Sequence, residues 1–402
     1  MSEIEKDISQ NYMKKGKQGK QSMMMRKTVA IVLSFVLAAG VIWGGLYMKS
    51  YDRTIPAAST KAISEEKFEN ADIKNLAMEY LEVIGTRLTD RNAGENEDEN
   101  QHDKAKEWII SQLKEAGYSD DAIKTSDFDL DKNAHGTNIE VILPGRDNAR
   151  QVIAGAHYDG DGVGDNGSGI ALLLAEAVGM KRMTPAFTTK FVFFDAEEIG
   201  ELGSQDYVGK MTDEEIKNTL YMVNIDSVAF GDYCNIYGGT AMPLMPESLG
   251  LSPYRYAVER AKTAGLKVMD TKDLDGYYAA HGAGPEILEN TLYTNPWTKK
   301  NPSPENFNYP SPTTGDWGDH ASFVSKKIPY LYLEATNWYA KGDGGSEAYT
   351  GYFDTDNINI GKKGMFMNTK YDTLENLDQY FPGRAEKHFS IYAKLLTCML
   401  LG

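Results

Sequence analysis

Short apolar runs alternate with helical segments through the middle of this 402-residue chain, and this alternation restricts the fold more than any other feature. Each run has the length and composition of a strand buried on both faces, and the segments between carry helical apolar spacing. Such alternation is typical of a largely parallel sheet covered by helices. The predicted fold class is α/β, a three-layer sandwich with a largely parallel mixed central sheet. The runs are NIEVIL (138–143), QVIAGAH (151–157), KFVFFD (190–195), LYMVNID (220–226) and IPYLYLE (328–334).

One long uncharged segment precedes this α/β part. Residues 28–48 are 21 residues without a charge, between Arg26-Lys27 and Lys49. As a helix rising about 1.5 Å per residue they would span roughly 31 Å, close to the hydrocarbon thickness of a bilayer. Residues 1–27 hold seven Lys/Arg and three Asp/Glu, and basic flanks stay in the cytoplasm. The fold is therefore expected to follow one transmembrane helix.

Four segments follow from this reading. We expect a cytoplasmic basic tail (1–27), a transmembrane anchor (28–48), a polar stalk (49–63) and an extracytoplasmic domain (64–402) of a single-pass protein of the cell membrane. A cleavable signal peptide is the competing interpretation, although the apolar run is longer than a signal peptide's apolar core of about 7–15 residues. Within the domain, residues 230–318 are expected to be an insertion that shapes the substrate pocket.

Charge and cysteine content exclude some functions. The formal net charge is −16, and phosphate binding needs clustered Lys/Arg, so nucleic acid is not expected as a partner. Cys234 and Cys398 are the two cysteines, and we interpret them as unpaired unless the fold brings them within disulfide range.

Polar side chains stand where the predicted strands end. His157 and Asp159 end one strand region, Glu197-Glu198 follow the next, and Asp226 ends a third. Asp165 lies in the glycine-rich loop GDGVGDNGSG between them. Ligands of α/β sheets bind at this edge, and zinc takes imidazole and carboxylate ligands. The set therefore predicts a divalent metal site.

Other interpretations exist for most of these residues. His157 could be a core histidine with satisfied hydrogen bonds. The segment 159–165 could be a calcium loop, although it lacks the spacing of the twelve-residue calcium loop with its terminal Glu. The pair Glu197-Glu198 could be the solvated start of a helix.

Six short motifs follow one another along the chain: HYD (157–159), GDNGSG (164–169), DAEEIGELGSQDY (195–207), NID (224–226), DHASF (319–323) and NTKYDTLENL (368–377). In this order they resemble a zinc exopeptidase family. This family includes secreted bacterial leucyl-type aminopeptidases, glutamate carboxypeptidase, glutaminyl cyclase and the transferrin receptor ectodomain, and the resemblance covers roughly residues 64–402.

The resemblance implies a role for each matching residue. His157 and Asp226 would bind one zinc ion, Asp165 would bridge two ions, and Glu198 would bind the other. Asp159 would orient the His157 imidazole. Glu197 would be the general base that takes a proton from water and passes it to the leaving amine. Asp319 and His320 would belong to the substrate pocket.

One position departs from the family pattern. The last zinc ligand is usually a histidine, and the matching residue here is Asn368. An amide oxygen is a poorer zinc ligand than an imidazole. Three outcomes stay open: Asn368 binds zinc weakly, the protein works with one zinc instead of two, or it has lost catalysis. His320 is a substitute-ligand candidate.

The leading hypothesis is a zinc-dependent aminopeptidase that hydrolyses peptide or protein substrates. The first alternative is a non-catalytic binding ectodomain that kept the peptidase fold. The second is a one-zinc acyltransferase of the glutaminyl cyclase type.

Overall fold

The computed structural model divides the chain into two units, Met1–Arg53 and Thr54–Gly402. It describes residues 37, 38, 40, 42, 55, 70–94, 101–130, 134–239, 253–270, 289–294, 317–336, 366, 367 and 369–402. The predicted anchor 28–48 lies outside the described residues except for Leu37, Ala38, Gly40 and Ile42, which are helical. No helix among the described residues is long and apolar enough to cross a membrane.

The second unit contains the sheet, and five of its strands coincide with the predicted apolar runs. The strands are β1 (Ile123–Asp129), β2 (His135–Leu143), β3 (Asp147–His157), β4 (Phe187–Phe194), β5 (Thr219–Ile225), β6 (Tyr233–Gly239), β7 (Lys267–Asp270), β8 (Thr291–Thr294) and β9 (Tyr330–Thr336). Across the described part of the chain their order is β1-β2-β4-β3-β5-β9-β6-β8-β7.

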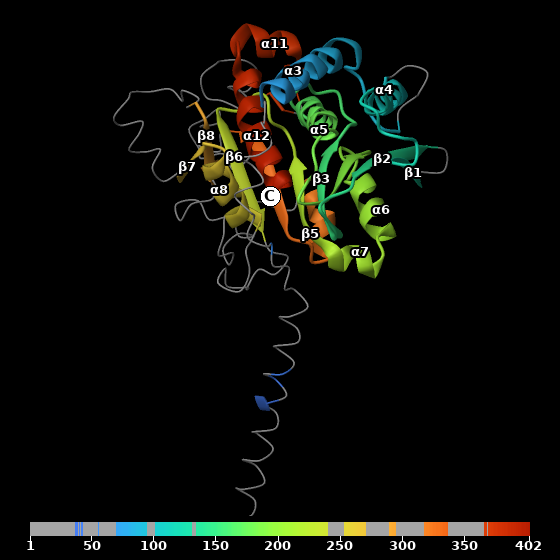
Figure 1. The fold of residues 1–402 in the computed structure, drawn as a ribbon. Helices are drawn as coiled ribbons and strands as arrows, with labels where there is room; N and C mark the ends of the chain where they lie inside the picture. The colour runs from blue at the N-terminus through green and yellow to red at the C-terminus, as the bar shows by residue number, and fades with distance from the viewer. Residues whose placement is uncertain are drawn as a thin grey trace, which may run out of the picture. The chain divides into compact units, whose positions relative to one another are not determined.

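In chain order the helices lie between the strands, before the first strand and after the last one, and most of them are labelled in Figure 1. They are α3 (Asn70–Arg87), α4 (His102–Glu115), α5 (Gly167–Met180), α6 (Leu202–Lys210), α7 (Asp213–Asn218), α8 (Pro253–Thr263), α10 (His320–Ser325), α11 (Leu374–Tyr380) and α12 (Arg384–Leu401).

Four neighbouring strands at the centre of the sheet run parallel. His157 of β3 pairs with Phe194 of β4, Gly155 of β3 pairs with Asn224 of β5, and β5 pairs with β9 in the same direction. Antiparallel pairs join β1 to β2, β2 to β4 and β6 to β9. The prediction of an α/β fold with a large mixed sheet is confirmed. The carboxyl ends of the central strands therefore meet at one edge.

Successive residues of the central strands enter two different cores. Ile153, Val192 and Met222 pack with residues of α6 and α10 on one face of the sheet. Their neighbours, such as Ala154 and Phe193, join the larger core on the other face. Helices α3, α4 and α12 all contact α5 in that larger core (Figure 1). Nearly every residue of α5 is buried, which fits a helix covered by neighbouring elements on several sides.

The region 230–318, which was predicted to be an insertion, contributes strands to the sheet. Its described part supplies β6, β7 and β8, which extend the sheet beyond β9. Ile236 of β6 pairs with Leu333 of β9, so this region continues the sheet. These strands escaped prediction because β6 reads YCNIYGG, rich in tyrosine and glycine, and β7 and β8 have only four residues each.

The two cysteines are free. Cys234 lies on β6 and Cys398 on α12, and both are buried. The interpretation as two unpaired residues is confirmed.

Candidate metal centre

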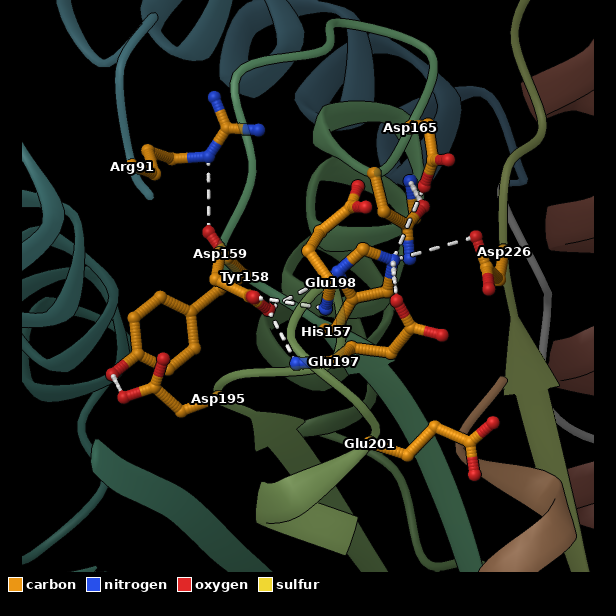
Figure 2. A network of polar contacts seen from close by, with 12 residues as sticks. Arg91, His157, Tyr158, Asp159, Asp165, Asp195, Glu197, Glu198, Glu201 and Asp226 are labelled. Carbon is orange, nitrogen blue, oxygen red and sulfur yellow. Dashed lines mark hydrogen bonds and ion pairs between the residues drawn. The ribbon is translucent and has the colours of Figure 1, made fainter. Parts of the chain in front are cut away.

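The acidic and imidazole side chains lie at the edge of the sheet where the parallel strands end. His157 is the last residue of β3, and Asp226 directly follows β5. Glu197 and Glu198 follow β4 after a turn in which Ala196 has a φ of 58°. Asp165 lies in the glycine-rich loop just before α5. Side chains from three strand ends and one loop therefore point toward one another (Figure 2).

His157 is the centre of this group. Its Nε2 lies 3.2 Å from Asp165 Oδ1, 3.5 Å from Asp226 Oδ1 and 3.8 Å from Glu197 Oε2. The ring is buried, with 1% of the residue exposed. One atom of each of His157, Asp165 and Asp226 lies within 4.8 Å of the others, and the same holds for His157, Glu197 and Glu198. Both sets are compact enough to hold a metal ion.

Asp159 ties the end of β3 to the loop after β4. Its Oδ1 accepts from the main-chain N–H of Glu197 and its Oδ2 accepts from that of Glu198, both at 3.1 Å. The same Oδ1 lies 3.3 Å from His157 Nδ1. The carboxylate is fully buried. It therefore fixes the imidazole and the two glutamates relative to one another.

The electrostatics of the group favour a cation. Burial lowers the pKa of His157, but the carboxylates of Glu197 and Asp226 outweigh burial and raise it well above its ordinary value. Burial and then the charge of Asp226 raise the pKa of Asp165. Burial also raises the pKa of Glu197 well above normal, against the opposing charge of His157. These carboxylates repel one another, and a divalent cation between them would relieve that repulsion.

The donor set fits zinc. One buried imidazole nitrogen and several carboxylate oxygens converge, which is a donor combination found in zinc hydrolases. The Nδ1 side of His157 faces Asp159, so Nε2 is the nitrogen directed at the converging oxygens. This arrangement of a carboxylate behind a ligating imidazole is usual in metal sites.

Asn368 lies outside the described residues, but the segment that follows it contacts the site. Asp372 Oδ2 accepts from the main-chain N–H of Asp165 at 2.9 Å, and its Oδ1 accepts from that of Gly164. The main-chain N–H of Val163 donates to the Asp372 carbonyl at 3.2 Å. Asp372 belongs to the motif NTKYDTLENL, but its sequence context alone assigns it no role. It holds the loop that carries Asp165.

The two predicted pocket residues lie beside the metal centre. Asp319 precedes α10 and is fully buried, and burial raises its pKa to about 8. The His320 ring packs on Tyr330 and Tyr332, with centroids 4.6 and 4.8 Å apart. Tyr332 donates to Asp226 Oδ2 at 3.2 Å. His320 therefore reaches the site through Tyr332, and among the described residues it belongs to neither metal-binding group.

Comparisons with known proteins agree with the geometry. Residues 138–273 match the model of peptidase family M28, which confirms the resemblance to zinc exopeptidases. The alkaline phosphatase isozyme conversion protein of Escherichia coli is 26% identical over 226 residues, which are 56% of this chain and 54% of that protein. The probable lipoprotein aminopeptidase LpqL of Mycobacterium tuberculosis is 33% identical over 33% of this chain and 30% of that protein.

These matches have a limited extent. The chain spans about half or less of the length of these two curated relatives. Among solved structures, a glutaminyl cyclase of an Acidobacteriales bacterium aligns with a TM-score of 0.53 at 17% identity, over 86% of this chain and 97% of that one. At this identity the likeness is one of fold.

Removing the Asp372 carboxylate should loosen the loop that carries Asp165. Asp372→Ala leaves the N–H groups of Gly164 and Asp165 without this acceptor, and a buried unpaired donor costs about 1–3 kcal/mol. We expect the free energy of unfolding in urea to fall by about that amount. Asp372→Asn keeps one acceptor oxygen and should lose less. The exposed Asp378→Ala on α11 is the control, and equal stability of all the variants would contradict the role of Asp372.

Proposed function

We propose, from the match of residues 138–273 to peptidase family M28 and from the metal centre described above, that the chain is a zinc-dependent exopeptidase. Aminopeptidase activity is the most specific form of this proposal, because two relatives that match part of this chain are named as aminopeptidases. One observation carries this proposal. Glu197 and Glu198 lie close enough to His157 to share a metal ion with it, and Glu197 Oε2 lies 3.8 Å from His157 Nε2.

The side chains of the cluster divide into ligands and supporting groups. His157, Asp165, Asp226 and Glu198 would hold the zinc, and Asp159 would orient the His157 ring. When bound, zinc polarises a peptide carbonyl and makes water a stronger acid. We propose one or two ions per chain, depending on whether the segment around Asn368 contributes a ligand.

Glu197 is placed to move protons. It lies on the loop after β4, and its carboxylate is largely but not completely buried beside the ligand cluster. A carboxylate here can take a proton from the attacking water at Oε2 and give it to the leaving amine. Its main-chain N–H donates to Asp159, so the base is held against the group that orients His157.

The amide variant Glu197→Gln tests this role. It keeps the shape of the side chain and removes the base, so we expect zinc content to stay unchanged while turnover of aminoacyl-anilides falls by about 10²–10⁴-fold. Zinc is counted by mass spectrometry on protein purified without chelator. Glu214→Gln, an exposed glutamate of α7, is the control.

The result also separates the alternatives. Equal turnover in wild type and Glu197→Gln would remove the general-base assignment. A wild-type chain with neither zinc nor turnover would favour a non-catalytic binding ectodomain. Release of ammonia from an N-terminal glutaminyl peptide, without anilide hydrolysis, would favour the acyltransferase alternative that Asn368 motivates.

Asn368→His tests whether position 368 is a metal ligand. The nearby Asp372 binds the main chain of Asp165, which favours placing this segment at the metal centre. We expect the imidazole to raise zinc bound per chain, or to tighten the weaker ion, and to raise turnover. Asn148→His, at an exposed position near the start of β3, is the control. Unchanged zinc stoichiometry, affinity and turnover in Asn368→His would contradict the assignment.

We further propose that residues 28–48 anchor the chain in the cell membrane with the catalytic unit outside the cytoplasm. Support comes from the uncharged length of this segment and from its basic N-terminal flank. The full chain should stay in the membrane pellet after alkaline carbonate washing, and protease added outside spheroplasts should digest it. Release of a shortened chain into the medium would instead indicate a cleaved signal peptide.

A further inference from the structure

One buried arginine binds the loop that joins the metal-site residues. Arg91 follows α3 and is 0% exposed. Its Nε donates to the Tyr158 carbonyl at 3.0 Å and its Nη2 donates to the Gly162 carbonyl at 2.9 Å. Its main-chain N–H donates to the Gly160 carbonyl at 3.1 Å. A single residue thus holds the backbone at three points between His157 and Asp165, and Figure 2 shows the contact with Tyr158.

Arg91 also brings a positive charge beneath an acidic site. Burial lowers its pKa, and the carboxylates of Asp159 and Asp372 oppose this fall. A guanidinium stays protonated in proteins, so the charge persists. The side chain also donates to Leu88, and its bonds to carbonyl groups leave the carboxylates of the site available to other partners.

A second side chain from the same N-terminal segment reaches the ring of Tyr158. His102, at the start of α4, stacks on that ring with centroids 5.2 Å apart and planes 25° from parallel. Its Nε2 lies 2.7 Å from Asp195 Oδ1. The Tyr158 hydroxyl donates to Asp195 Oδ2 at 2.9 Å. His102, Tyr158 and Asp195 therefore form one buried group.

This group adjoins both halves of the metal site in the sequence. Tyr158 stands between His157 and Asp159 at the end of β3. Asp195 ends the run KFVFFD and lies two residues before Glu197. His102 thus contacts the strand end that carries His157 through Tyr158, and it contacts the segment that leads to Glu197 through Asp195.

We propose that Arg91 and His102 are positioning residues that set the spacing between the His157–Asp165 loop and the Glu197–Glu198 loop. The proposal rests on the proposed zinc function. It extends the site to Arg91 and His102, which precede the segment 138–273 that matches the peptidase family. A purely structural role would stabilise the fold without acting on metal binding, and the experiments below separate the two.

Arg91→Met is the first test, with metal alone as the probe. We expect the folded variant to bind Zn²⁺ about 10- to 100-fold more weakly in competition with a chromophoric chelator, as is usual for residues that support metal ligands. The visible absorption spectrum of bound Co²⁺ should change as well. With saturating zinc, kcat should fall while KM changes little. Arg91→Lys should recover part of the affinity. An ammonium donates to carbonyls, but it cannot reach the carbonyls of Leu88, Tyr158 and Gly162 together as the guanidinium does.

Arg260→Met is the matched control. Arg260 is a buried arginine on α8, packed against Tyr256, and it belongs to neither loop of the site. Its loss should lower the unfolding midpoint and leave zinc affinity and the Co²⁺ spectrum unchanged.

His102 offers an independent pair of variants. The side-chain amide of His102→Gln can still donate to Asp195, whereas His102→Leu cannot. We expect zinc affinity to fall in His102→Leu and to be largely retained in His102→Gln. If Arg91→Met does not fold, zinc affinity and the Co²⁺ spectrum of Arg91→Lys, His102→Leu and His102→Gln test the positioning role instead.

The outcomes are distinct. Wild-type zinc affinity and an unchanged Co²⁺ spectrum in folded Arg91→Met and His102→Leu would overturn the positioning role and leave the proposed function standing. A wild-type chain that binds no zinc would overturn both. Weakened zinc binding in these variants, with native binding in Arg260→Met, is the expected result.

Discussion

The parallel pairing of β3 with both β4 and β5 is the constraint on which the site depends. Main-chain hydrogen bonds set these strands in register, so that His157 lies opposite Phe194 and Gly155 lies opposite Asn224. Because the three strands end together, the residues that follow them must share one small volume. Six acidic or imidazole side chains placed there repel or attract one another at close range. Burial on both sides of the sheet keeps solvent from screening these charges.

The neighbouring acidic side chains are stabilised by main-chain N–H groups and by one nearby cation. Asp159 and Asp372 direct their oxygens at N–H groups of the loops that carry Glu197 and Asp165. Arg91 places a charge behind the loop without pairing directly with a ligand. The carboxylates that face His157 are thereby held in place while keeping oxygens for a cation. This differs from a stabilising ion-pair network, in which the charges would neutralise one another.

Much of the fold could be predicted from the chain, because the central strands are continuous apolar runs and their polar ends stand out. The His157 cluster followed from the same pattern. Strands β7 and β8 could not be predicted, since four residues carry too little periodicity. Asp372 and Arg91 escaped as site residues because their partners are far away in sequence: Gly164 is 208 residues from Asp372, and Gly162 is 71 from Arg91. Nothing local distinguishes such a side chain from a surface charge.

The contact between Asp372 and the Gly164–Asp165 backbone has a consequence for the order of assembly. The glycine-rich loop is made early, but its acceptor, the strand β9 that borders β5, and Tyr332, which binds Asp226, all come late in the chain. During synthesis the ligand loops therefore exist for some time without the residues that fix them. The metal centre therefore gains its final geometry only when the C-terminal part of the chain has folded back onto the sheet.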